Sequence, residues 1–125
     1  IIRLYKMKKI YYLSTCSTCS RILKDLDELL SEFKLQDIKT EKITLDQIEQ
    51  MRALSGSYES LFSRRAMKYK SMGLGDQDLS EDDYKKYILE EYTFLKRPVF
   101  VIEDEIFIGN SSKIVESVRL KLANN

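Results

Sequence analysis

The sequence contains no histidine, and this absence excludes two classes of functional site at once. Neither a Ser-His or Cys-His nucleophile pair nor a histidine metal ligand can be built from the chain. Any nucleophile must therefore be activated by a cation, by backbone dipoles or by a helix end.

Long hydrophobic runs and an excess of charge of one sign are also missing. No stretch approaches the roughly 20 consecutive apolar residues that span a bilayer, so we expect no membrane association. The 21 Lys and Arg residues are interleaved with 20 Asp and Glu residues, and the formal net charge is only +1. A free-standing DNA-binding protein is usually more basic. We therefore expect no direct nucleic-acid binding, whereas binding through a protein partner stays open.

Cysteine is scarce, with only Cys16 and Cys19 among 125 residues. A chain of this length buries enough surface to form one core without disulfides. The first six residues lack the small-residue cleavage site of a signal peptide. We therefore interpret residues 1–6 as an N-terminal extension of unknown origin and expect a cytoplasmic, reducing location. In that setting a close cysteine pair is more often catalytic or metal-binding than structural.

The first third of the chain predicts a β-α-β unit. Residues 9–13 and 35–38 are apolar and β-rich, and between them apolar residues recur at helical spacing from Ile22 to Phe33. A right-handed crossover through one helix favours parallel strands. The cysteines therefore fall between a strand and a helix, with Cys16 at or just before the first turn.

The remainder of the chain predicts helices, a hairpin and a last helix. Helical segments occupy about residues 42–92, a β-hairpin follows at 99–108, and Asn110 or Ser111 caps the last helix. The order is β-α-β and then β-β-α, which is an α/β thioredoxin-like fold with a helical insertion. No linker or repeat interrupts it, so we predict a single domain over residues 7–123.

Local signals mark the bounds of the helical segments. Thr44–Gln47 fits a capping box, and Ser80–Asp83 starts a later helix. Between them, residues 60–75 predict a short helix that stops at Gly73 and Gly75.

The Cys16-x-x-Cys19 pair admits three interpretations. A structural zinc site needs four ligands, so carboxylates or a second subunit would have to complete it. Free cysteines are often buried as small hydrophobic residues, but these two lie in a polar Ser/Thr loop. As a reactive dithiol, a thiolate at a helix N-terminus has its pKa lowered by free N–H groups and the helix dipole. Cys16 is then the candidate nucleophile, and Cys19, one turn further, the candidate resolving thiol.

The loop around the cysteines is also suited to an anion. The hydroxyls of Ser14, Thr15, Ser17 and Thr18 can add hydrogen bonds to the sulfur, and backbone N–H groups at a helix start bind oxyanions. The loop therefore predicts an oxyanion substrate if arginines, whose donors match two oxygens at once, lie nearby.

Two arginine positions are candidates for that role. Pro98, the only proline, opens the third strand and follows Arg97. A trans bond at a sheet edge is one interpretation. By analogy with thioredoxin-type folds we expect a cis bond, with Arg97 directed toward Cys16. Arg64 and Arg65 are either a solvated helix face or a second part of the site.

Three stretches together resemble a known family. They are LSTCSTCSRIL (13–23), LFSRRAMKYKSMGL (61–74) and FLKRPVFVIEDEIFIGN (94–110). In this order and spacing they resemble the arsenate reductase family of the glutaredoxin-linked type, which also holds the Spx-type regulators. The resemblance covers about residues 7–120. It implies a thioredoxin-like fold with a helical insertion, no bound cofactor, and glutathione with glutaredoxin or thioredoxin as reductant.

For the enzymes of that family, the resemblance implies that the cysteine at Cys16 attacks arsenate. Glutathione then joins the arsenic, glutaredoxin resolves the adduct, and arsenite is released. The resemblance also implies that Arg97 and Arg65 hold the oxyanion. The chain departs from the pattern at Cys19, where well-studied reductases have serine. Two further arginines of those reductases, near residues 58–60 and after the last strand, are also missing.

Three functions follow as hypotheses. The first is a thiol oxidoreductase of the arsenate reductase family, attacking an arsenate-like oxyanion or a mixed disulfide. The second is a redox-switched regulator, because the resemblance extends to Spx-type proteins, in which the cysteine pair is a switch and the RNA polymerase α subunit is the partner. The third is a general thiol–disulfide oxidoreductase.

Overall fold

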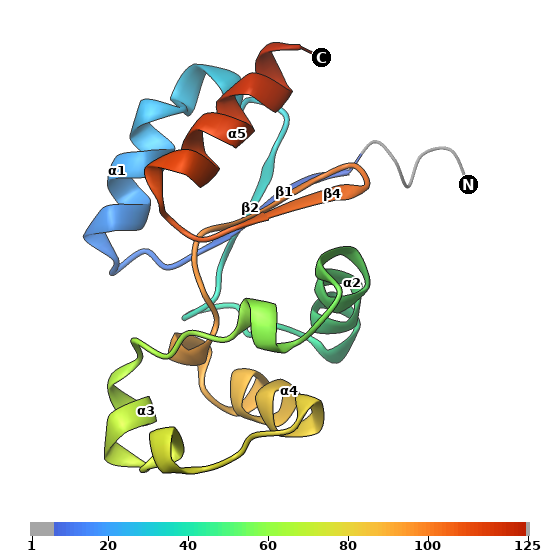
Figure 1. The fold of residues 1–125 in the computed structure, drawn as a ribbon. Coiled ribbons are helices and arrows are strands. Elements are labelled where there is room, and N and C mark those ends of the chain that lie inside the picture. The colour runs from blue at the N-terminus through green and yellow to red at the C-terminus, as the bar shows by residue number, and fades with distance from the viewer. Residues whose placement is uncertain (1–6, 125) are drawn as a thin grey trace. The chain divides into compact units, whose positions relative to one another are not determined.

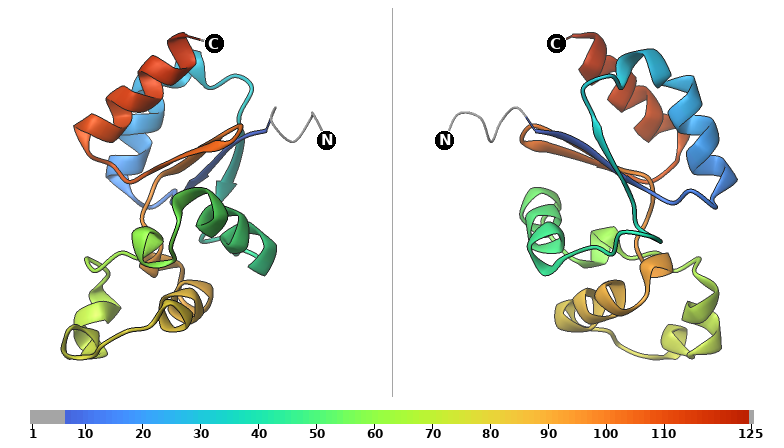
Figure 2. Two further views of the ribbon diagram at one scale, coloured as in Figure 1. Left: turned by 45° about the vertical axis from the view of Figure 1, so that its right-hand side comes forward. Right: turned by 180° about the vertical axis from the view of Figure 1, so that it is seen from behind.

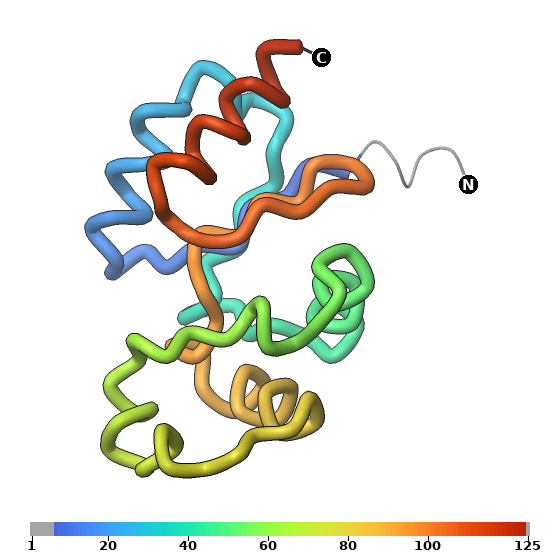
Figure 3. Tube along the Cα trace, in the orientation of Figure 1, coloured from blue at the N-terminus to red at the C-terminus, as the bar shows by residue number. Residues whose placement is uncertain are grey.

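The computed structural model describes residues 7–124, and the chain divides into two compact units. Unit 1 contains the chain up to Glu41 and from Arg97 onward, and unit 2 is Lys42–Lys96. The tube in Figure 3 follows the chain out of unit 1 after the second strand and back into it before the third. The predicted extension, residues 1–6, lies outside the described residues.

Unit 1 is built on a four-stranded sheet in the order β2-β1-β3-β4 (Figure 1). β1 (Lys8–Tyr12) pairs in parallel with β2 (Lys34–Asp37), which confirms the predicted parallel β-α-β unit. β1 also pairs antiparallel with β3 (Val99–Ile102), and β3 pairs antiparallel with β4 (Glu105–Ile108). All four residues of β3 are buried, so the strand that follows the proline is central and not at an edge.

Two helices cover one face of this sheet. α1 (Ser17–Asp25) and α5 (Ser112–Ala123) lie side by side on it in each view of Figures 1 and 2, and the short 3-10 helix η2 (Asp27–Leu29) follows α1. The side chains packed between sheet and helices form the core cluster Ile10, Ile22, Leu26, Phe100, Ile102 and Val118. Full burial of such a side chain contributes roughly 1.5–3 kcal/mol, so this core holds α1 against the strand that precedes it.

Unit 2 consists of helices. They are α2 (Leu45–Ser55), α3 (Met67–Ser71) and α4 (Glu81–Glu90), with the 3-10 helices η3 (Glu59–Leu61), η4 (Leu74–Asp76) and η5 (Tyr92–Phe94). The insertion predicted at about residues 42–92 corresponds to this unit. The assignment of the whole chain to a single domain stays a prediction. No helix within residues 7–124 is long and apolar enough to cross a bilayer.

The predicted capping signals in unit 2 are confirmed, whereas one helix is shorter than predicted. Thr44 and Gln47 form a reciprocal capping box, and Ser80 caps α4. The helix predicted over residues 60–75 is reduced to α3, because Phe62 has extended backbone and pairs with Leu95 in an isolated β-bridge.

Candidate functional site

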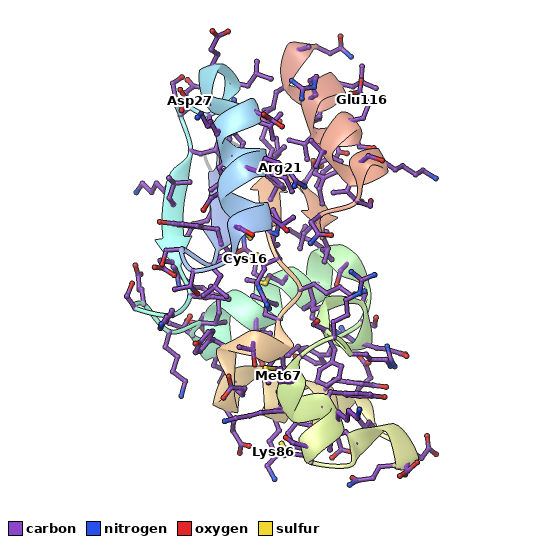
Figure 4. All side chains as sticks on the ribbon, turned by 90° about the vertical axis from the view of Figure 1, so that its left-hand side faces the viewer. Cys16, Arg21, Asp27, Met67, Lys86 and Glu116 are labelled. Carbon is purple, nitrogen blue, oxygen red and sulfur yellow. The ribbon has the colours of Figure 1, made fainter. Side chains whose placement is uncertain are left out.

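Cys16 is the N-cap residue of α1, as the hydrophobic pattern predicts. Its N–H donates to the Leu13 carbonyl at 3.0 Å, and its carbonyl accepts from the Ser20 N–H at 3.1 Å. The first bond closes a turn after β1 and the second begins the helix. Figure 4 shows Cys16 at this end of α1, with Arg21 further along the same helix.

The thiol of Cys16 is partly exposed and is easier to ionise than an ordinary cysteine. Partial burial opposes ionisation, but the surrounding groups outweigh it and lower the pKa of Cys16. Hydrogen bonding from the backbone N–H and the thiol of Cys19 comes first, followed by the backbone N–H of Thr18 and the charge of Arg97. The N–H groups of Thr18 and Cys19 are among those that a helix leaves without partners at its start. The N–H groups at the helix start therefore favour the thiolate form of Cys16.

Cys19 has the opposite character. Its residue is fully buried, and burial raises the pKa of its thiol to about 11, with the negative charge of the Cys16 thiolate acting in the same direction. Both thiols are free, so no disulfide joins them in this structure. Cys16 is therefore the more acidic thiol of the pair, and the Cys19 S–H donates toward the Cys16 sulfur.

Arg97 supplies the cationic charge expected at the site. The Arg97–Pro98 peptide bond is cis, which confirms the expectation. The guanidinium lowers the pKa of both Cys16 and Cys19 by its charge, as expected for a side chain directed at the pair. Arg97 is half-buried, so solvent screens its charge less than it would screen the charge of an exposed side chain.

The four Ser and Thr residues around Cys16 differ in their contacts. The Ser14 side chain hydrogen-bonds the carboxylate of Asp37, and the Ser14 N–H also donates to Asp37 Oδ1 at 3.3 Å. Thr18 acts on the Cys16 sulfur through its backbone N–H. Thr15 and Ser17 are exposed, and their proposed hydrogen bonds to sulfur or substrate stay predictions.

Asp37 is the site residue that the sequence pattern does not reveal. It ends β2 and lies level with Tyr12, the last residue of β1. A polar residue at the carboxyl end of a strand that neighbours the cysteine strand is the one signal that could have indicated it.

The second arginine pair belongs to unit 2. Arg64 donates to Glu59 Oε2 at 2.8 Å and to the Tyr84 hydroxyl at 2.9 Å, so it is engaged within that unit. Arg65 is exposed. Its predicted role beside Cys16 stays a prediction.

A separate hollow of about 300 Å³ lies between α1 and α5. Arg21 and Asp25 line it from α1, and Glu116 and Arg119 from α5, so its charges balance. Neither cysteine lines it, and it therefore adds nothing to the thiol site. Within residues 7–124 no three His, Cys, Asp or Glu side chains are grouped to hold a metal ion.

Comparisons with known proteins identify the family and the fold of the chain. Residues 11–118 match the model of the ArsC family. Global transcriptional regulator Spx 2 of Bacillus anthracis is 24% identical over 105 residues, which is 82% of this chain and 79% of that protein. A possible arsenate reductase from Streptococcus mutans has a TM-score of 0.73 at 26% identity, with 91% of this chain and 98% of that chain covered.

A further solved structure, arsenate reductase from Vibrio cholerae, has a TM-score of 0.74 at 18% identity and covers 94% of this chain and 98% of its own. These similarities confirm the predicted α/β thioredoxin-like fold.

Proposed function

The chain belongs to the ArsC family, and on this premise we propose that it is a thiol oxidoreductase whose nucleophile is the Cys16 thiolate. One observation carries the proposal: Cys16 is the partly exposed N-cap of α1 and feels the charge of Arg97, whereas Cys19, one turn further along the helix, is fully buried. A nucleophilic thiol needs a large thiolate fraction at neutral pH, and its resolving partner attacks only after the first bond has formed.

The disulfide reaction proceeds in two exchanges. The Cys16 thiolate attacks one sulfur of a glutathione or protein disulfide, forms a mixed disulfide and expels the other sulfur as a thiolate. Cys19 then loses its proton and attacks the Cys16 sulfur, which closes a Cys16–Cys19 disulfide and releases the second thiolate. Glutaredoxin, thioredoxin or glutathione reduces this disulfide and returns both cysteines to thiols.

An arsenate-like oxyanion is the substrate class that the charges favour. The N-terminus of α1 offers backbone N–H groups, and Arg97 adds a guanidinium near the same sulfur. The Cys16 sulfur displaces one water from arsenic(V), and the sulfur of glutathione displaces a second. A glutaredoxin thiolate then attacks the glutathione sulfur, so a glutathione–glutaredoxin disulfide leaves and the electron pair of the broken S–As bond reduces the arsenic to arsenic(III). Water then cleaves the bond between arsenic(III) and Cys16. Thiols supply the two electrons, and arsenite leaves. Arg65 is the proposed second guanidinium, and we place the reaction in the cytoplasm with no tightly bound cofactor.

The test measures arsenate turnover with glutathione and glutaredoxin and, separately, with thioredoxin. Exchange with a small glutathione mixed disulfide is measured in parallel. We expect turnover in at least one assay and none for Cys16→Ser. Turnover by Cys19→Ser with glutathione assigns a monothiol mechanism, and trapped mixed disulfides assign Cys19 as the resolving thiol. Absence of arsenate turnover by folded, reduced protein excludes the oxyanion, and undiminished activity of Cys16→Ser excludes the nucleophile.

A second function is supported by the similarity to the Bacillus anthracis transcriptional regulator and by the two thiols in one loop. In this proposal, closure of the Cys16–Cys19 disulfide switches binding to the RNA polymerase α subunit. Affinity capture with the purified α subunit, performed with reduced and with oxidised protein, tests it. Capture that depends on the redox state supports the regulator, and no capture in either state excludes it.

A further inference from the structure

The carboxylate of Asp37 binds Ser14, which lies in the segment between β1 and α1. The Ser14 N–H donates to Asp37 Oδ1 at 3.3 Å, and the Ser14 side chain hydrogen-bonds the same carboxylate. The Lys39 N–H also donates to Oδ1, at 3.2 Å, which fixes the direction of the carboxylate. These contacts join two segments 23 residues apart in the chain.

The sheet places Asp37 at this position. In the parallel pairing of β1 with β2, Asp37 lies level with Tyr12, and the Ile38 N–H donates to the Tyr12 carbonyl at 2.9 Å. One residue after Tyr12, the Leu13 carbonyl accepts from the Cys16 N–H. The segment between β1 and α1 is therefore held at two points. One is the hydrogen bond from the Cys16 N–H to the Leu13 carbonyl, and the other is the contact of Ser14 with the Asp37 carboxylate.

We propose that Asp37 is a positioning residue for Cys16: its carboxylate fixes the loop so that Cys16 stays the N-cap of α1 and its sulfur stays against the backbone N–H groups of Thr18 and Cys19. The inference rests on the proposed function only in taking Cys16 as the nucleophile. Asp37 itself does not touch the reacting sulfur.

The physical reason is the freedom of a short loop. Without the carboxylate, Ser14 and the residue after it gain backbone conformations. In some of these, the Cys16 sulfur leaves the helix start and loses the N–H groups that favour the thiolate. Loss of the anchor should therefore raise the pKa of Cys16. Loss of a negative charge alone acts in the opposite direction, since removal of a nearby anion favours a thiolate.

This difference in sign allows a direct test. Alkylation rates of Cys16 by iodoacetamide, located by mass spectrometry, are measured from about pH 5 to about pH 10 for the wild type and three variants. Asp37→Ala removes the acceptor, and Asp37→Asn keeps one oxygen that can accept from Ser14. Asp27→Ala removes an exposed aspartate of unit 1 outside the loop and is the charge-matched control.

We expect Asp37→Ala to raise the pKa of Cys16, which slows alkylation below that pKa about threefold. Asp37→Asn and Asp27→Ala should stay near the wild type. An unchanged or lowered pKa in Asp37→Ala overturns the inference, as does an equal rise in Asp37→Asn. An ordinary Cys16 pKa in the wild type overturns the proposed function and this inference together. A lowered wild-type pKa that does not respond to Asp37→Ala overturns this inference alone.

A second variant approaches the same contact from the loop. Ser14→Ala removes the side-chain hydrogen bond and keeps the N–H, so we expect a smaller rise in the same direction. Far-UV circular dichroism and thermal unfolding verify that each variant is folded. If Asp37→Ala does not fold, a fall or no change of the Cys16 pKa in Ser14→Ala overturns the proposal.

Discussion

Cys16 and Cys19 lie one turn apart at the start of α1, yet Cys16 is partly exposed and Cys19 is fully buried. Burial opposes ionisation at both, but at Cys16 the N–H and S–H donors around the sulfur prevail and lower its pKa, whereas burial raises the pKa of Cys19 to about 11. One helix start therefore separates two identical groups into a more acidic thiol and a neighbour that keeps its proton.

The Cys19 thiol should contribute to that separation as a hydrogen-bond donor. Cys19→Ala removes the S–H that donates to the Cys16 thiolate, so we expect the pKa of Cys16 to rise and its alkylation at neutral pH to slow about threefold. Cys19→Ser keeps a donor and should stay closer to the wild type. The pH profile of Cys16 alkylation measures both, and equal profiles for the wild type and Cys19→Ala would contradict the role of the donor.

Arg97 should act on both thiols through its charge. Arg97→Gln removes the positive charge, so the pKa values of Cys16 and Cys19 should both rise, and alkylation of Cys16 should slow by up to about threefold. Arg97→Lys keeps the charge and should preserve the pKa of Cys16 while weakening oxyanion turnover, because an ammonium cannot bind two oxygens side by side.

The matched control for Arg97 is Arg119→Gln on α5. Arg119 lies 3.6 Å from Glu116, and its loss changes the net charge by the same amount. Titration of the thiols in Arg97→Gln, Arg97→Lys and Arg119→Gln measures the effect. A Cys16 pKa that moves equally in Arg97→Gln and Arg119→Gln would show a general effect of net charge and would remove Arg97 from the site.

The sequence predicts local features of this site well and contacts between distant segments poorly. The position of Cys16 at a helix start follows from apolar spacing, and the cis bond before Pro98 from analogy with thioredoxin-type folds. The contact of Ser14 with Asp37 depends on the register of β2 against β1, which no local pattern encodes. The bridge from Phe62 to a residue far along the chain likewise shortens a helix that local spacing predicts to be longer.

Ile22 should couple the stability of unit 1 to the site, because it anchors α1 in the core. Its side chain is 3% exposed, and Ile22→Ala should lower the free energy of unfolding by about 2–5 kcal/mol. Leu120→Ala on α5, where the side chain is 54% exposed, should change it by about 0.5 kcal/mol or less. Urea denaturation measures both, and equal losses would contradict the assigned core.

Alkaline pH should destabilise the fold. Burial raises the pKa of Cys19 from 9.0 to about 11 and that of Tyr11 from 10.0 to about 12, with Glu41 adding to the effect on Tyr11. A raised folded-state pKa means that the stabilisation is complete below the unfolded pKa and is lost as pH rises through the folded one. The free energy of unfolding should therefore fall above about pH 9. Urea denaturation across this range should show a shallower fall for Tyr11→Phe, and a wild-type curve without slope would contradict the burial of both groups.

Direct titration of the Cys16 thiolate is the sharpest test of the proposed nucleophile. Ultraviolet absorbance of the thiolate is followed against pH in the wild type and in Cys16→Ser, and the difference isolates one sulfur. We predict a Cys16 pKa below that of an ordinary free cysteine, with Cys19 remaining protonated throughout that transition. A Cys16 pKa at or above the ordinary value would contradict the account.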